Sequence, residues 1–470
     1  MSSRFRRIVK FVPMALVLMA AGSVLFNVSA VSKPGRTAAD AKASRANDAL
    51  FNRGRQVFRF DTFGDQAFWG DTLQLNKAIA GSANGGVGGG VSPKTALTVG
   101  LKVDSSALPG AVKSAIKQGK VDLNDPKTTL ALLKLNAVVG LKGFFNKGGT
   151  SLRSVGITCA VCHSTVDNSF APGIGRRRDG VPNRDLNVGA IISLAPNLKP
   201  FTDLLGADAA TVKKVLAAWG PGKFDAELSL DGKGFRPDGK TAAVLIPPAY
   251  GLSGVNLHTF TGWGSITYWN AFVANLEMHG IGNFHDARLN DATKFPIAAK
   301  AGFADVRHSK DLISSKLGAL QAYQLGLPIP QPRPGSFNAA AARRGRAIFM
   351  GAGKCASCHV PPTYSEPGEN LRTPQEICTD SFQADRSPSG MYRTTPLRGL
   401  MAHSKGGLYH DGRFATLGAV VDHYNSCMNL NLTAGQKTDL VEFLKTLGTG
   451  TIPSSRPRHG SRRASAKFTG

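Results

Sequence analysis

The sequence predicts a mainly helical protein built from two related domains, the first of which carries a long, loop-rich insertion. Residues 52–58 (Asn-Arg-Gly-Arg-Gln-Val-Phe) resemble residues 343–349 (Arg-Arg-Gly-Arg-Ala-Ile-Phe), and a Cys-x-x-Cys-His motif follows each copy of this repeat. A chain of 470 residues exceeds the ~250–300 residues at which a single hydrophobic core stops growing. The 54 glycines and 26 prolines indicate many loops between short elements.

Residues 1–30 are typical of a signal peptide. Basic residues precede an apolar run over residues 11–28, and small residues at 28–30 form a cleavage site. We therefore expect cleavage after Ala30 and a periplasmic or secreted mature protein. An uncleaved anchor is the alternative, because the apolar run approaches the ~18 residues at which a membrane span becomes plausible.

The six cysteines carry the strongest signal in the chain. Four of them belong to residues 159–163 (Cys-Ala-Val-Cys-His) and 355–359 (Cys-Ala-Ser-Cys-His). Thiols at this spacing lie on one side of a helical turn, where each can add to a haem vinyl group, and the next histidine can ligate the iron. A redox dithiol or a zinc site does not need that histidine. We expect two covalently bound haem c groups, held by Cys159, Cys162, His163, Cys355, Cys358 and His359.

Cys378 and Cys427 remain after the two motifs are assigned. In an oxidising compartment an even remainder indicates a disulfide, so we expect these two residues to pair. Two separate free thiols are the alternative.

We expect each motif to lie in a cytochrome c-like haem domain. The first domain covers residues 48–335 and contains an insertion at about 63–149, since the first repeat and the first motif stand far apart while the second repeat leads into its motif almost at once. The proline-rich residues 328–334 mark the boundary. The second domain covers 336–452, and residues 453–470 form a disordered basic tail.

Three further helices follow from the spacing of apolar residues. Residues 211–219 and 266–278 repeat apolar side chains every three or four positions. Residues 434–447 form the last helix, with Thr433 as N-cap and Gly448 just beyond its end.

The net charge of +26 indicates which kinds of binding partner to expect. It favours encounters with a small acidic redox protein. Nucleic acid is not expected as a partner of an exported protein without an aromatic-interleaved basic groove motif. Contact with a membrane is expected only through an uncleaved N-terminus or the basic tail.

The C-terminal part of the chain resembles a known enzyme superfamily. The segments are residues 392–400 (Tyr-Arg-Thr-Thr-Pro-Leu-Arg-Gly-Leu), 407–417 (Gly-Leu-Tyr-His-Asp-Gly-Arg-Phe-Ala-Thr-Leu) and 420–425 (Val-Val-Asp-His-Tyr-Asn). They resemble bacterial di-haem cytochrome c peroxidases and MauG, the related enzyme that matures tryptophan tryptophylquinone. In the first domain only the haem motif and the Arg-Gly-Arg start match. The resemblance implies that the N-terminal haem meets hydrogen peroxide and that the C-terminal haem relays electrons.

The resemblance also implies residues for the second haem. The ligand position falls on Tyr424, as in MauG, and an anionic oxygen donor there would favour oxidised iron. Met428, one turn further on, is the alternative, Met401 is a more remote one, and both Tyr424 and Met428 could instead be packing residues beside an open site. His410 is expected beside this haem, near a propionate, with a surface turn as the alternative.

For the first haem the candidates come from chemistry alone. Cleavage of peroxide needs a group that moves a proton between its two oxygens, and Glu277 and His279 at the end of the helix 266–278 could do so or serve as a displaceable ligand. The aromatic residues 263–269, after His258, are expected to form a wall of the pocket. For electron transfer between the haems, or for packing, the chain offers Trp219, Trp263 and Trp269.

Together these observations predict a periplasmic di-haem oxidoreductase with peroxidase-like activity. A pure electron-transfer cytochrome and an oxygenase resembling the di-haem rubber oxygenases are the alternatives. Calcium stays open as a further cofactor, although the sequence does not locate a site for it.

Overall fold

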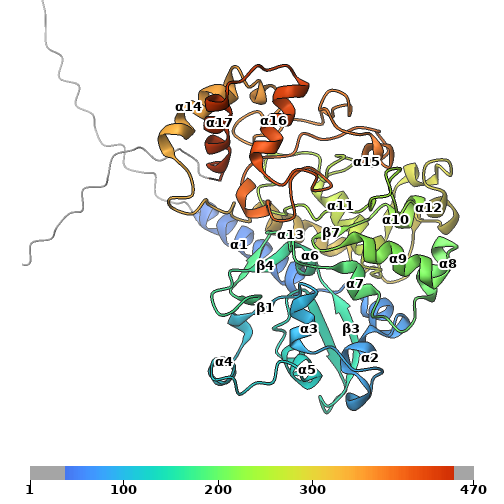
Figure 1. Cartoon of the computed structure of the whole chain (residues 1–470). Helices are drawn as coiled ribbons and strands as arrows, with labels where there is room; N and C mark the ends of the chain where they lie inside the picture. The colour runs from blue at the N-terminus through green and yellow to red at the C-terminus, as the bar shows by residue number, and fades with distance from the viewer. Residues whose placement is uncertain (1–37, 449–470) are drawn as a thin grey trace, which may run out of the picture. The chain divides into compact units, whose positions relative to one another are not determined.

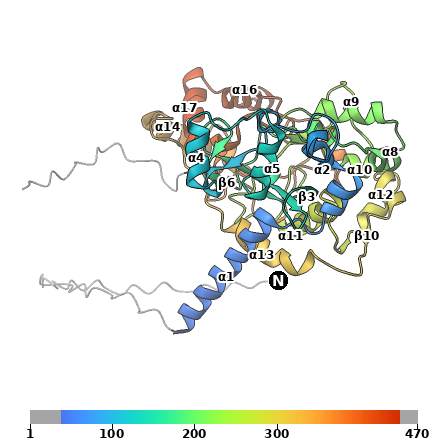
Figure 2. The same cartoon turned by 90° about the horizontal axis from the view of Figure 1, so that it is seen from below.

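Two pairs of crossing helices correspond to the two copies of the sequence repeat. The structure is a computed structural model that describes residues 38–448, with side chains from Arg45 onward. Helix α1 (Ala38–Phe60) crosses α13 (Ser314–Leu325), and α14 (Ala339–Met350) crosses α17 (Ala434–Lys445) (Figures 1 and 2). The predicted signal peptide and the predicted basic tail lie outside the described residues. Contacts divide the chain after Ala46, and the features below lie in the unit that begins at Asn47.

The same packing occurs at both crossings. A Cβ atom on Gly54 would overlap the Ala319 carbonyl, so α13 approaches the backbone of α1 directly. Four residues later Phe58 packs against Tyr323, with ring centroids 5.4 Å apart. The repeat in the sequence is therefore a repeat of a helix crossing that depends on one glycine and one phenylalanine.

The second crossing uses the matching residues. Gly345 faces the Asp439 carbonyl in the same way, and Phe349 packs against Phe443 with centroids 5.1 Å apart. Phe349 and Phe443 are buried in a core of the C-terminal part of the chain.

Short helices and loops make up most of the rest. Within residues 38–448 the strands are few and short, so the expectation of a mainly helical fold is confirmed. The other helices are α2 (Leu75–Ala80), α3 (Pro93–Thr98), α4 (Gly110–Lys117), α5 (Pro126–Lys134), α6 (Ala160–His163), α7 (Val188–Ile192), α8 (Lys199–Leu205), α9 (Ala209–Trp219), α10 (Leu228–Asp231), α11 (Ile266–Phe272), α12 (Pro296–Ala301), α15 (Phe382–Asp385) and α16 (Leu417–Cys427).

The described strands form two-stranded ladders. One ladder is parallel, β1 (Val103–Asp104) with β5 (Ile174–Gly175). The antiparallel ladders are β2 (Leu141–Phe145) with β3 (Leu152–Ile157), β4 (Ser164–Val166) with β6 (Arg177–Asp179), β7 (Lys223–Phe224) with β8 (Val244–Leu245), and β9 (Phe284–His285) with β10 (Asp305–Val306).

The three helices predicted from apolar spacing are confirmed. The helix expected at 211–219 is α9, and the last helix is α17, where Thr433 and Gln436 form a capping box. The helix expected at 266–278 begins as α11 and continues as a π-helical turn, η4 (Val273–Glu277). Such turns change which way the following side chains point, and they occur often at functional sites.

The predicted insertion, residues 63–149, packs into the main core rather than standing apart. Its residues Leu73 and Leu133 are buried with residues of α9 in one cluster. Its strand β2 pairs with β3, the strand that leads into the first Cys-x-x-Cys-His motif. The insertion therefore helps to enclose that motif. The domain boundary at residue 336 stays a prediction.

The predicted disulfide between Cys378 and Cys427 is confirmed. It joins the loop after the second motif to the end of α16. Within residues 38–448, no helix combines the length and the hydropathy that a bilayer crossing needs.

Gly345→Ala should lower the free energy of unfolding by about 1–3 kcal/mol, because the new methyl group meets the backbone of α17. Gly435→Ala is the matched control, since Gly435 lies in α17 with open space around it. This control should raise the free energy of unfolding by about 0.5–1 kcal/mol through better helix propensity. Denaturant titration of both variants measures the two values, and equal effects would contradict the close crossing.

Candidate functional site

The first Cys-x-x-Cys-His motif lines a cavity of about 290 Å³. Cys159, Cys162 and His163 follow directly after β3, and all three contribute to the wall. His163 Nδ1 lies 3.1 Å from the Pro247 carbonyl oxygen, so its Nε2 is the nitrogen left for a ligand. Burial lowers the pKa of His163 to about 4, which keeps the ring neutral and able to bind a metal ion.

The second motif lines a separate cavity of about 240 Å³. Cys355, Cys358 and His359 stand in its wall, and His359 Nδ1 lies 3.0 Å from the Tyr364 carbonyl oxygen. Burial lowers the pKa of His359 as well. The two motifs thus present the same set of groups in two cavities.

The thiols differ from those of a redox dithiol. Burial raises the pKa of Cys159 and Cys162 to about 12 and that of Cys355 to about 11, whereas reactive dithiols have lowered values. A zinc site is not supported either, because neither motif belongs to a cluster of three or more potential metal ligands among the described residues.

Buried guanidinium groups at the cavities lack acidic partners. Arg393 lines both cavities and its Nη1 has no hydrogen-bond partner, while its Nε donates to the Thr259 carbonyl oxygen at 2.8 Å. Arg184 lines the second cavity with Nε and Nη1 unpaired. Burial lowers the pKa of both side chains to about 10. An anionic group such as a haem propionate would pair with them, so these residues fit a haem in each cavity.

The structure brings together the residues predicted for the second haem. Tyr424, Met428 and His410 all line the second cavity. His410 Nε2 is buried without a hydrogen-bond partner. Met401 is not in this wall, and its side chain is 44% exposed.

The two residues predicted for the first haem have different positions. Glu277, at the end of η4, lines the first cavity. His279 does not, because its ring stacks on Phe68 with centroids 3.6 Å apart. Burial, followed by the neighbouring carboxyl groups of Glu227 and Asp225, raises the pKa of Glu277 well above its usual value. Glu277 therefore releases its proton at a higher pH than an exposed glutamate does.

Only some of the aromatic residues that were expected to line the first cavity do so. His258 and Trp269 line the first cavity. Trp219 and Trp263 are buried in hydrophobic clusters instead. The aromatic residue that lines both cavities is Phe260, which the sequence analysis missed although it stands two positions after His258.

A buried ion-pair cluster stands behind the first cavity. Arg386, which follows α15, binds Asp231 through two hydrogen bonds of 2.8 and 2.9 Å and pairs with Asp225 at 3.0 Å. All three side chains are fully buried. Burial, with the nearby Glu227 and Asp231, raises the pKa of Asp225 to about 7 despite Arg386. No local sequence pattern marks this cluster, and the sequence analysis missed it.

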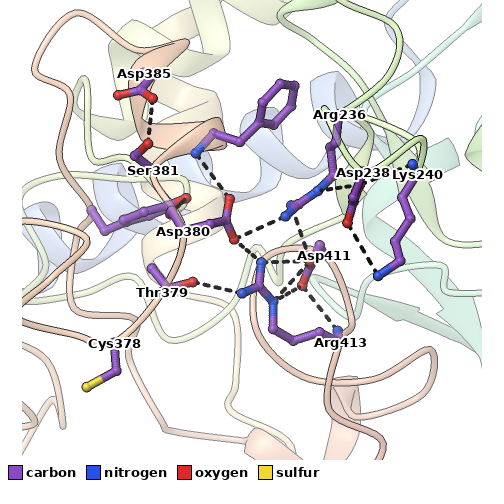
Figure 3. Close-up of polar contacts among 12 residues, drawn as sticks. Arg236, Asp238, Lys240, Cys378, Thr379, Asp380, Ser381, Asp385, Asp411 and Arg413 are labelled. Atoms are coloured by element: carbon purple, nitrogen blue, oxygen red, sulfur yellow. Dashed lines mark hydrogen bonds and ion pairs between the residues drawn. The ribbon is translucent and has the colours of Figure 1, made fainter. Parts of the chain in front are cut away.

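A second network joins two arginines to two aspartates (Figure 3). Arg236 pairs with Asp380 at 3.2 Å and with Asp411 at 3.4 Å, and Arg413 pairs with the same two carboxylates. Ligand atoms of Asp380, His410 and Asp411 lie within 4.8 Å of one another. Because two guanidinium groups already neutralise both carboxylates, we assign this group as an ion-pair network and not as a calcium site.

Comparisons with known proteins give only distant likenesses. No protein-family model and no curated protein matches the chain. A MauG-like protein associated with microbial copper homeostasis is 18% identical over 45% of this chain and 76% of that chain, with a TM-score of 0.31. Kuenenia stuttgartiensis hydrazine synthase is 18% identical over 46% of this chain and 76% of that chain, with a TM-score of 0.25. Neither value carries an argument about function.

Asp225→Asn should change how stability depends on pH. The raised pKa of Asp225 means that the unfolded chain releases this proton near pH 4 and the folded chain only near pH 7, so its contribution to stability falls as the pH rises between them. The wild type should lose up to about 1.4 kcal/mol per pH unit relative to the variant over this range. Thermal unfolding midpoints of both proteins from pH 4.5 to 8 provide the measurement, and a constant difference would contradict the raised pKa.

Proposed function

We propose that the protein is a di-haem c-type oxidoreductase that reduces hydrogen peroxide in the first cavity and passes electrons through the second. The observation that supports this most is the asymmetry between two otherwise similar cavities. Each has two thiols and an imidazole in its wall, but the carboxyl group of Glu277, whose pKa is raised by burial, lines only the first.

In this proposal the two motifs hold the haem groups. The four thiols would form the covalent links, and His163 and His359 would ligate the irons through Nε2, because their Nδ1 atoms face backbone carbonyl oxygens. Haem iron supplies a site that binds peroxide and exchanges electrons. Arg393 and Arg184 would hold propionates, since their buried donors have no acidic partner.

Glu277 is proposed as the acid–base group. Cleavage of the bond between the peroxide oxygens is easier when one oxygen gives up a proton and the other receives it. A carboxyl group that lines the cavity and whose pKa is raised by burial suits this task. A pure electron carrier has no need of such a group.

The wall between the cavities supports electron transfer from one to the other. Four residues line both cavities: Pro248, Phe260, Thr395 and Arg393. Electrons would come one at a time from a small acidic redox protein, which the net charge of +26 favours. The two glycine-dependent helix crossings support two cytochrome c-like units, and the disulfide suits the oxidising periplasm.

The first test is peroxide reactivity. As isolated, the holoprotein should show one five-coordinate high-spin haem beside a low-spin one by electron paramagnetic resonance, and peroxide should change the optical spectrum. Glu277→Gln should slow this reaction by about 10²–10⁴-fold. The exposed Glu369→Gln should leave it unchanged. Two low-spin haems that ignore peroxide would make the protein an electron-transfer cytochrome.

A pair of substitutions identifies the second axial ligand. If Tyr424 ligates the second haem, Tyr424→Phe should convert its spectrum to that of an open site and raise its reduction potential, because an anionic donor is lost. Met428→Leu should then leave both unchanged. The reverse result would assign Met428, and no effect from either variant would contradict both. Spectra and redox titration of the purified holoproteins give the answer.

A further inference from the structure

Three polar side chains from distant parts of the chain meet on the wall of the first cavity. Glu227 comes just before α10, Glu277 ends η4, and Gln383 belongs to α15. All three line the cavity, while the side chains of Glu227 and Gln383 are almost fully buried, at 6% and 2% exposure. Gln383 is hydrogen-bonded to Glu227, and Ser229 Oγ lies 3.5 Å from Glu277 Oε1.

Acidic side chains outnumber basic ones around Glu227. The charged groups that face Glu227 are Arg386, Asp225, Asp231 and Glu277. Arg386 pairs with the two aspartates through Nε and Nη2, and its Nη1 donates to the Ala242 carbonyl oxygen at 3.5 Å. Full ionisation would therefore set four carboxylates against one guanidinium among largely buried side chains. Carboxyl groups in such a cluster share protons, because like charges close together cannot all ionise.

Unpaired acceptors give a second, independent indication. Gln383 Oε1 and Asp225 Oδ2 are buried and have no hydrogen-bond partner. A buried acceptor without a donor is costly, so each site calls for a proton-bearing group nearby. Protonated carboxyl groups or an OH group bound in the cavity would supply that donor.

We propose that Glu227 is the second proton-carrying group of the first cavity and that it reloads Glu277 during each turnover. This inference rests on the proposed function. Reduction of one peroxide molecule breaks its O–O bond, forms two O–H bonds, consumes two protons and takes two electrons from the acidic redox partner. Glu277 gives a proton to one oxygen, Glu227 passes its own proton to Glu277, Glu277 gives this second proton to the other oxygen, and two protons from solvent restore both carboxyl groups.

The shifts of the two carboxyl groups agree with this arrangement. Burial raises the pKa of Glu227, while Arg386 and the Gln383 amide act in the opposite direction. The pKa of Glu277 is raised well above its usual value by burial, Glu227 and Asp225, and the Ser229 hydroxyl acts in the opposite direction. Glu227, which Arg386 and Gln383 stabilise in its ionised form, thus releases a proton more easily than Glu277 does. This difference favours proton transfer from Glu227 to Glu277.

Arg386 has a positioning role in this proposal. It lies 155 positions after Asp231 in the sequence, so the C-terminal part of the chain supplies the cation that limits how many protons the cluster keeps. Gln383, three residues before it, holds Glu227 on the cavity wall.

The test uses Glu227→Gln, which keeps the size and hydrogen-bonding capacity of the side chain. Infrared difference spectra of the holoprotein at pH 5 to 9, in H₂O and D₂O, should show protonated carboxyl bands in the wild type at pH 7. The variant should lose one of them. Its rate with peroxide should fall by about 10²-fold or more and should depend differently on pH. Unchanged haem spectra and an unchanged unfolding midpoint show that the fold is intact.

Gln383→Met provides a second route if the first variant does not fold. Removing the amide that favours the ionised form should keep the Glu227 band to higher pH, a change that a purely structural role would not produce. Infrared spectra and pH profiles identical to the wild type in these variants would overturn the inference. Carboxyl bands that change as expected in a protein that ignores peroxide would sustain the proton-sharing pair and overturn the peroxidase proposal.

Discussion

The buried ion pairs of Arg386 with Asp225 and Asp231 connect the C-terminal segment to the part of the chain that lines the first cavity. A guanidinium taken out of water is expensive unless its donors are paired, and here two aspartates from the segment before and within α10 supply the partners. The same contacts place Gln383 and Glu227 on the wall of the first cavity. The acidic side of that cavity cannot be complete without a residue of the C-terminal segment, so the two cavities are not independent modules joined by a linker.

The wall that the two cavities share also links the two halves of the chain. Phe260 and Arg393 belong to different halves of the sequence, yet each lines both cavities. Arg393 N–H donates to the Phe260 carbonyl oxygen at 2.9 Å, so the backbone of one half positions the side chain of the other. Because the two cavities share these wall residues, a change of charge in one cavity alters the electrostatic potential in the other.

Patterns that are local in the sequence could be predicted, and those that depend on distant partners could not. Residue spacing predicted the two motifs and the capped helix α17, and the expected oxidising compartment predicted the disulfide. The repeated Arg-Gly-Arg segments correspond to equivalent helix crossings. The sequence could not separate Glu277 from His279, because a π-helical turn decides which of two close neighbours faces the cavity. The Arg386 pairs join segments 155 positions apart and leave no periodic trace.

The C-terminal segment completes a cavity whose haem motif stands far earlier in the chain. The first helix crossing is finished where α13 ends, at Leu325, whereas Gln383, Arg393 and Arg398 belong to the wall of the first cavity. A chain cut after α13 would therefore keep every residue of the first crossing and still lack one side of the cavity around Cys159 and Cys162.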